Sequence, residues 1–90
     1  MAVKALVGMN AFKGSLPAQK ACALVAAGFR RGFPEARVVE IPLADGGDGT
    51  LDVLVGARSG TSQYMEVTGP YNQPVKCKLG WLPGGTAVIE

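Results

Sequence analysis

Short apolar runs and longer amphipathic stretches alternate along the first 60 residues of the chain. The run from Ala2 to Gly8 is typical of a parallel strand covered on both faces. Residues 16–32 repeat apolar side chains at helical spacing, and the repeat is formed by Ala18, Cys22, Val25 and Phe29. A second strand over 37–42 and a second helix over 50–57 follow. This order predicts the βαβα unit of a parallel sheet in an α/β fold.

Turn-forming residues mark the ends of these elements. Ser15 is predicted to be the N-cap of the first helix, and Pro17 is compatible with its first turn. Gly32 and the proline after it end that helix, and Gly60 ends the second. Because the carboxyl ends of parallel strands meet at one edge of a sheet, we expect the turns after the two strands to lie together there.

The pattern after Gly60 changes from helical to extended. Residues 62–68 alternate, a turn with two prolines follows, and the next strand places every second residue on one apolar face, formed by Val75, Cys77, Leu79 and Trp81. This predicts an antiparallel hairpin. A third extended segment over 86–90 reaches the last residue, which favours a piece cut from something longer.

We therefore expect a single piece over residues 1–90, which the family resemblance described below implies to be N-terminal. Residues 1–60 form its βαβα part with the ligand-binding turns, and residues 61–90 form a β-rich segment that is incomplete.

Composition narrows the class of protein. The chain is 48% apolar and 18% charged with a net charge of +2, which fits a globular protein and gives no electrostatic footprint for a nucleic acid. Cys22 and Cys77 lack metal-ligand spacing, so free buried thiols in a reducing compartment are expected. The apolar N-terminal run is shorter than a signal-peptide core or a membrane span. These features predict a cytoplasmic protein without a membrane or nucleic-acid partner.

The turn from residue 44 to residue 50 carries the clearest chemistry, because it combines three glycines with two acids. Glycine lets the backbone adopt positive φ and lets a ligand approach the amides. Asp45 and Asp48 add carboxylates, so the turn suits phosphate, a metal ion or a small hydroxylated ligand. Asp48 is equally well explained as the N-cap of the second helix, whereas no helix near Asp45 needs a cap.

Lys13 lies in the turn before the first helix. It is either a solvated side chain or a point charge for a phosphate or carboxylate, which helix N-termini also favour. Familiar phosphate and calcium motifs do not fit. Lys13 precedes Gly14, the reverse of the P-loop order, Asp52 occupies the third glycine position of the dinucleotide fingerprint, and Leu51 replaces the acid of the calcium nonapeptide.

Several segments together resemble the N-terminal part of the bacterial glycerate kinase family. They are Phe12-Lys13-Gly14-Ser15-Leu16, the helix end over 28–34, the run over 41–50, and Val67-Thr68-Gly69-Pro70 with Pro74-Val75. The match spans essentially the whole chain. The resemblance implies part of a longer two-domain α/β kinase that transfers the γ-phosphate of ATP to glycerate with Mg²⁺ in a cleft between domains.

The resemblance also implies roles for individual residues. The catalytic residues would be Lys13, Asp45 and Asp48, with the two acids as Mg²⁺ ligands. Contacts to glycerate or phosphate would come from Asn10, Ser15, Gly46, Gly47, Gly49 and Thr50. The family often has Asp-Ser where this chain has Asn10-Ala11, and usually Glu in place of Asp48.

Alone, the 90-residue chain is expected to be inactive. The alternative interpretation is a non-catalytic α/β module that binds at most an anion and forms a homo-oligomer through the open edge of its unfinished sheet.

Overall fold

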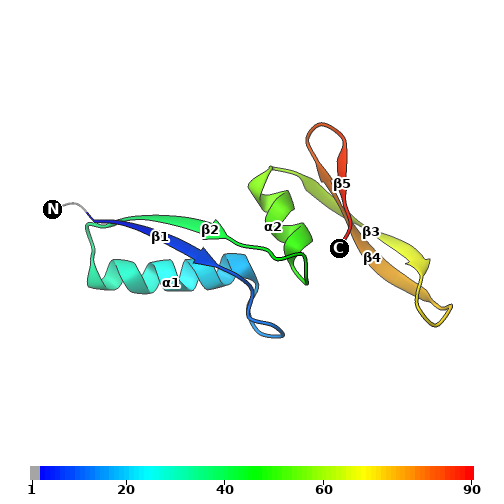
Figure 1. Cartoon of the computed structure of the whole chain (residues 1–90), viewed down its shortest axis with the longest axis horizontal. Coiled ribbons are helices and arrows are strands. Elements are labelled where there is room, and N and C mark those ends of the chain that lie inside the picture. The colour runs from blue at the N-terminus through cyan, green and yellow to red at the C-terminus, as the bar shows by residue number, and fades with distance from the viewer. Residues whose placement is uncertain (1–2) are drawn as a thin grey trace.

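The computed structural model describes residues 3–90, so the prediction for Ala2 lies outside the described residues. The elements in order are β1 (Lys4–Met9), α1 (Ala18–Gly32), β2 (Arg37–Pro42), α2 (Thr50–Ala57), β3 (Thr61–Thr68), β4 (Pro74–Leu82) and β5 (Thr86–Val88). They form a parallel pair, β1-β2, and an antiparallel sheet of order β3-β4-β5 (Figure 1). The predicted α/β class, with a parallel unit followed by an antiparallel hairpin, is confirmed. The grouping of residues 1–60 and 61–90 into one domain stays a prediction.

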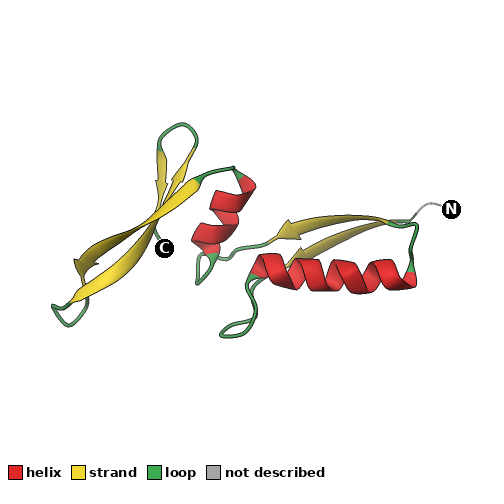
Figure 2. Ribbon diagram, turned by 180° about the vertical axis from the view of Figure 1, so that it is seen from behind, coloured by secondary structure: helices red, strands yellow, loops and turns green. Residues whose placement is uncertain are grey.

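The parallel unit is a two-layer structure. β1 pairs with β2 in a register that runs from Lys4 opposite Arg37 to Met9 opposite Pro42. α1 lies along one face of this pair, as Figure 2 shows from behind. The side chains that α1 buries are all small: Ala18, Ala21, Cys22 and Ala26. Small side chains let the helix approach the strands closely, which brings Cys22 Sγ to 3.6 Å from the carbonyl oxygen of Val7.

Two details of α1 differ from the prediction. Ser15 is not its N-cap, because the helix begins at Ala18 after Pro17, which makes no side-chain cap. The buried face also turns slightly: Val25 is 44% exposed, and Ala26 takes the buried position. Alanine fits there because it needs no space between helix and sheet, whereas the larger valine is directed outward.

The second face of the parallel pair is open in the part of the chain described here. Leu6 in the middle of β1 is 67% exposed, so the expectation that this strand is covered on both faces is wrong for residues 3–90. The reason is the path of α2, which packs against β4 instead of returning to the parallel strands.

α2 packs on β4 through a glycine. A Cβ atom at Gly80 would lie 2.9 Å from Val55 Cγ2, so only glycine lets the helix come this close. Lys78, two residues earlier on β4, pairs with Asp52 of α2. Alternate residues of a strand face opposite sides of the sheet, so Gly80 and Lys78 face α2 and Trp81 faces the other side. The predicted apolar face, which includes Trp81, is therefore the face that α2 leaves uncovered, and Trp81 is 40% exposed.

The molecule is elongated, with principal dimensions of 59 × 31 × 17 Å. Figure 1 shows α2 between the parallel pair and the antiparallel sheet. Both cysteines are free thiols, as predicted, but only Cys22 is buried, whereas Cys77 is partly exposed. No helix within residues 3–90 has the length and apolar character needed to cross a membrane.

Candidate functional site

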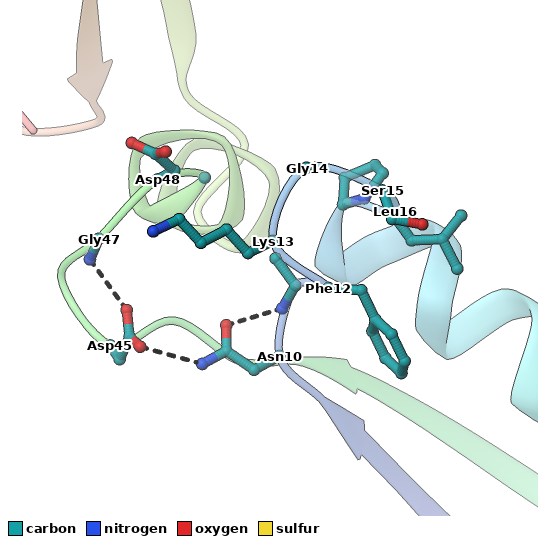
Figure 3. A pocket seen from close by; sticks show the side chains of 12 residues that line it. Asn10, Phe12, Lys13, Gly14, Ser15, Leu16, Asp45, Gly47 and Asp48 are labelled. Carbon is teal, nitrogen blue, oxygen red and sulfur yellow. Dashed lines mark hydrogen bonds between the residues drawn. The ribbon is translucent and has the colours of Figure 1, made fainter.

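The turns that follow β1 and β2 meet at one cavity of about 570 Å³ (Figure 3). β1 and β2 are parallel, so their carboxyl ends lie at the same edge, and the expected convergence of the two turns is confirmed. The lining comes from residues 10–17 of the first turn and from Asp45, Gly47, Asp48 and Gly49 of the second.

The first turn is a small closed loop. The Phe12 amide donates to the Leu16 carbonyl at 2.8 Å, and the Leu16 amide donates back to the Phe12 carbonyl at 3.0 Å. Gly14 at the tip has φ of +72°, a left-handed conformation that favours glycine. Lys13 and Ser15 lie in this closed loop before α1 begins, and Figure 3 shows the Lys13 side chain extending toward the second turn.

The second turn is held by bonds within itself and to the start of α2. Asp45 Oδ1 accepts from the Gly47 amide at 2.9 Å, and the Gly46 amide donates to Thr50 Oγ1 at 2.9 Å. The N-cap of α2 is Gly49, with φ of +94°. Asp48 is therefore not the N-cap. It contributes to the cavity lining, and Figure 3 shows its carboxylate pointing away from Asp45.

Asn10 joins the two turns. Its Nδ2 donates to Asp45 Oδ2 at 3.3 Å, while its Oδ1 accepts from the Ala11 amide at 2.7 Å. The Gly47 amide, and after it the Asn10 side chain, hold the pKa of Asp45 below its usual value. Asp45 therefore stays ionised further into the acidic range than a free aspartate, and its two hydrogen bonds fix its orientation.

Opposite charges share the cavity without neutralising each other. Neither Lys13 nor Asp48 belongs to an ion pair within residues 3–90, although both line the cavity. Lysine is a compact positive charge with three donors, and each carboxylate offers several acceptor positions. The arrangement can therefore bind an anion at one point and a cation or hydroxyl group at another.

The carboxylates of the cavity fit Mg²⁺ only where water and substrate phosphates supply further oxygen ligands. Among residues 3–90, no three His, Cys, Asp or Glu side chains gather into a metal site. Mg²⁺ prefers oxygen ligands and is commonly held by one or two carboxylates together with water and substrate phosphates. Asp45 and Asp48 suit that second arrangement, since both are exposed carboxylates at the edge of one cavity.

The structure brings together most of the residues that the sequence singled out. The cavity is lined by Asn10, Lys13, Ser15, Asp45, Gly47, Asp48 and Gly49. Gly46 and Thr50 do not line it but bond to each other and hold the turn. The proposed role of Gly46 and Gly47 as donors to a phosphate stays a prediction. In the structure both amides donate within the turn, to Thr50 Oγ1 and to Asp45 Oδ1, so they would have to give up these bonds to bind a phosphate.

The sequence reasoning missed the apolar part of the lining. Phe12, Leu16 and Pro17 contribute to the wall, and Phe12 remains exposed. An aromatic residue beside lysine and glycine in a polar turn is the signal that would have identified this wall, because a turn has no core in which to bury the ring.

Comparisons with known proteins point to one family. A sequence profile of the glycerate kinase family matches residues 5–90. The chain is 36% identical over 89 residues to glycerate 2-kinase of Escherichia coli K12 and 40% identical over 89 residues to glycerate kinase of Bacillus subtilis 168. Each match covers 98% of this chain and 23% of the relative.

A solved structure gives the same result at the level of the fold. The crystal structure of a glycerate kinase 2 from Salmonella typhimurium LT2 superimposes with a TM-score of 0.79 and is 34% identical. The superposition covers 94% of this chain and 23% of the Salmonella chain. The chain thus spans about a quarter of the length of the relatives that it matches.

Proposed function

The chain belongs to the glycerate kinase family, and on this premise we propose that it is the N-terminal part of an ATP-dependent kinase that phosphorylates a hydroxyl group of glycerate. The observation that carries the proposal is the meeting of Lys13, Asp45 and Asp48 at one cavity. Phosphoryl transfer depends mainly on positioning and on neutralising charge, and a cation beside two acids supplies both.

Lys13 is assigned to the anionic groups of the reaction. Its ammonium group, free of ion pairs within residues 3–90, neutralises the transferred phosphate or the carboxylate of glycerate. The neighbouring Ser15 and the amide of Asn10 provide further polar contacts at the same wall.

Asp45 is assigned to orientation and not to proton abstraction. Because its neighbours hold its pKa low, it is a weak base, but it stays ionised as a hydrogen-bond acceptor or metal ligand. In the transfer, the glycerate oxygen forms a bond to the γ-phosphorus as the bond from that phosphorus to the β-phosphate oxygen breaks. The hydroxyl proton leaves to solvent, because both carboxylates of the cavity are assigned to orientation or to Mg²⁺.

Mg²⁺ and ATP belong to the same proposal. Asp45 and Asp48 would hold the ion together with phosphate oxygens, and the ion supplies neutralisation of the phosphate charge. The cavity is open, and we propose that groups outside this chain bind the nucleotide base and close the cleft, so that the 90-residue chain alone is inactive. The free thiols Cys22 and Cys77 support a cytoplasmic location.

A hybrid enzyme tests the proposal. Residues 1–90 replace the matching 23% of the Escherichia coli glycerate 2-kinase, and ADP formation is followed in a coupled assay with glycerate and ATP. We expect glycerate-dependent turnover by the hybrid and none by the 90-residue chain alone. A folded hybrid without turnover, beside an active parent enzyme, would overturn the proposal.

The alternative of a self-associating, non-catalytic module rests on the open edges of the antiparallel sheet. β3 and β5 are its outer strands, and all eight residues of β3 are exposed. Size-exclusion chromatography of the 90-residue chain decides this alternative, because a clean monomer excludes it.

A further inference from the structure

The start of α2 takes its cap from a distant side chain. Gly49 occupies the N-cap position and has no side chain with which to accept from the free amides of the first turn. The amide of Leu51 donates instead to Glu90 Oε1 at 2.9 Å, across a separation of 39 residues. The Leu51 side chain is 1% exposed, so its amide has little access to water and depends on this acceptor.

Glu90 reaches the helix because β5 leads to it. Val88 at the end of β5 pairs with Gly80 of β4, and Gly80 is the residue on which Leu51 packs. The carboxylate therefore approaches the positive end of the helix from the sheet that supports the helix, which is favourable for a negative charge.

The first turn of α2 is in turn bonded to the acidic loop. Thr50, directly before Leu51, accepts from the Gly46 amide through Oγ1 and donates from its own amide to the Gly47 carbonyl at 3.1 Å. Gly47 bonds to Asp45. A continuous series of hydrogen bonds and covalent links thus runs from Glu90 through the start of α2 to the carboxylate of Asp45.

We propose that Glu90 is a positioning residue for this loop. Its carboxylate fixes where α2 begins, and this holds the loop that carries Asp45 and Asp48 at the cavity that Lys13 shares. Glu90 is absent from the cavity lining, so it acts through the helix and not on the substrate. The role deepens the proposed kinase function and rests on it for its effect on turnover.

Two substitutions at Glu90 separate the effect of its charge from the effect of its acceptor oxygen. Glu90→Gln keeps an acceptor oxygen and loses the charge, whereas Glu90→Ala loses both. Glu66→Ala is the matched control, because it removes the same charge from an exposed residue of β3. Hydrogen exchange of the hybrid defined above, followed by mass spectrometry, reports on residues 45–53, and the α1 segment reports whether each variant is folded.

We expect Glu90→Ala to accelerate exchange over residues 45–53 by about tenfold, since a buried amide loses a charged acceptor. Exchange in α1 should stay unchanged, and Glu90→Gln should recover most of the protection. In the coupled assay, Glu90→Ala should lower kcat by about tenfold with a smaller change in KM, because misplaced carboxylates affect the transition state more than binding.

The outcomes separate this proposal from the kinase assignment. If hydrogen exchange over residues 45–53 changes no more in Glu90→Ala than in Glu66→Ala, the role of Glu90 is overturned. This holds whether or not the hybrid is active. Faster exchange with unchanged kcat in an active hybrid also overturns it, since Glu90 would then be a structural cap only. An inactive but folded hybrid overturns the kinase function, and the exchange result still decides whether Glu90 holds the loop.

Discussion

Asn10 Nδ2 donates a hydrogen bond to Asp45 Oδ2 at 3.3 Å, and this bond connects the turn after β1 to the turn after β2. The two residues lie 35 positions apart in the sequence and meet only because the two strands are parallel. The bond orients one of the two acids that we assign to phosphoryl transfer. It also gives that acid a measurable property, a lowered pKa.

Asn10→Ala should raise the pKa of Asp45. The value should stay below about 3.9, the usual value for an unperturbed aspartate, because the Gly47 amide is the larger cause of the shift and remains in place. An NMR titration of the Asp45 carboxyl carbon measures the change, with the exposed Gln19→Ala as control. An unchanged midpoint would show that Asn10 does not contact Asp45 in solution.

The same shift fixes the direction of a pH effect. A carboxyl whose pKa is lower in the folded chain stabilises it above the unfolded pKa, and this contribution disappears as the pH falls through the folded value. Asn10→Ala should therefore cost stability at pH 7, and the part of this cost that comes from Asp45 should shrink as the pH falls through the folded pKa of that carboxyl. Thermal unfolding of the parent protein and of Asn10→Ala at pH 7 and at a series of lower pH values tests this sign. A stability difference between the two that grows on acidification would contradict it.

Gly80→Ala should separate α2 from β4. The added Cβ meets Val55 Cγ2 at 2.9 Å and Leu51 Cγ at 3.2 Å, so we expect a loss of about 1–3 kcal/mol in the free energy of unfolding. Gly28→Ala is the opposite case, because nothing lies within 4 Å of its Cβ and the residue is inside α1. It should stabilise by about 0.5–1 kcal/mol. Urea denaturation of both variants measures the contrast, and equal effects would refute this packing.

Lys78→Met should remove a small, pH-dependent contribution. The hydrogen bond to Asp52 raises the pKa of Lys78, so the pair stabilises the fold below about pH 10.4 and loses this effect as the pH rises through the higher folded value. Because the pair is partly exposed, we expect only about 0.5 kcal/mol at pH 8. Lys76→Met on the same strand is the control. If the stability difference between Lys78→Met and the control persists at high pH, the effect comes from packing of the aliphatic part of the Lys78 side chain and not from its charge.

The sequence was sufficient for the parts of the fold that depend on local pattern. Hydrophobic periodicity predicted the bounds of β2 and α2, and glycine-rich turns after two parallel strands predicted the convergence of Lys13, Asp45 and Asp48. These features follow from nearest neighbours and from the geometry of parallel sheets.

The remainder depends on contacts that no local pattern contains. Ser15 resembles an N-cap, but the bonds between Phe12 and Leu16 close a separate loop before α1 begins. The side on which α2 packs is decided by the missing side chain of Gly80. Glu90, which caps that helix from 39 residues away, carries no signal in its own neighbourhood.

The most direct test of the account is the turnover of the hybrid enzyme carrying Asp45→Asn, compared with the unmodified hybrid and with Glu35→Gln, an exposed acid in the turn between α1 and β2. The side chain keeps its size and loses only its charge. We predict that kcat falls by at least about 100-fold for Asp45→Asn, as expected for a carboxylate that orients the reacting group or holds Mg²⁺ in the transition state, and stays within twofold for Glu35→Gln. A rate for Asp45→Asn within a few-fold of the unmodified hybrid would contradict the account.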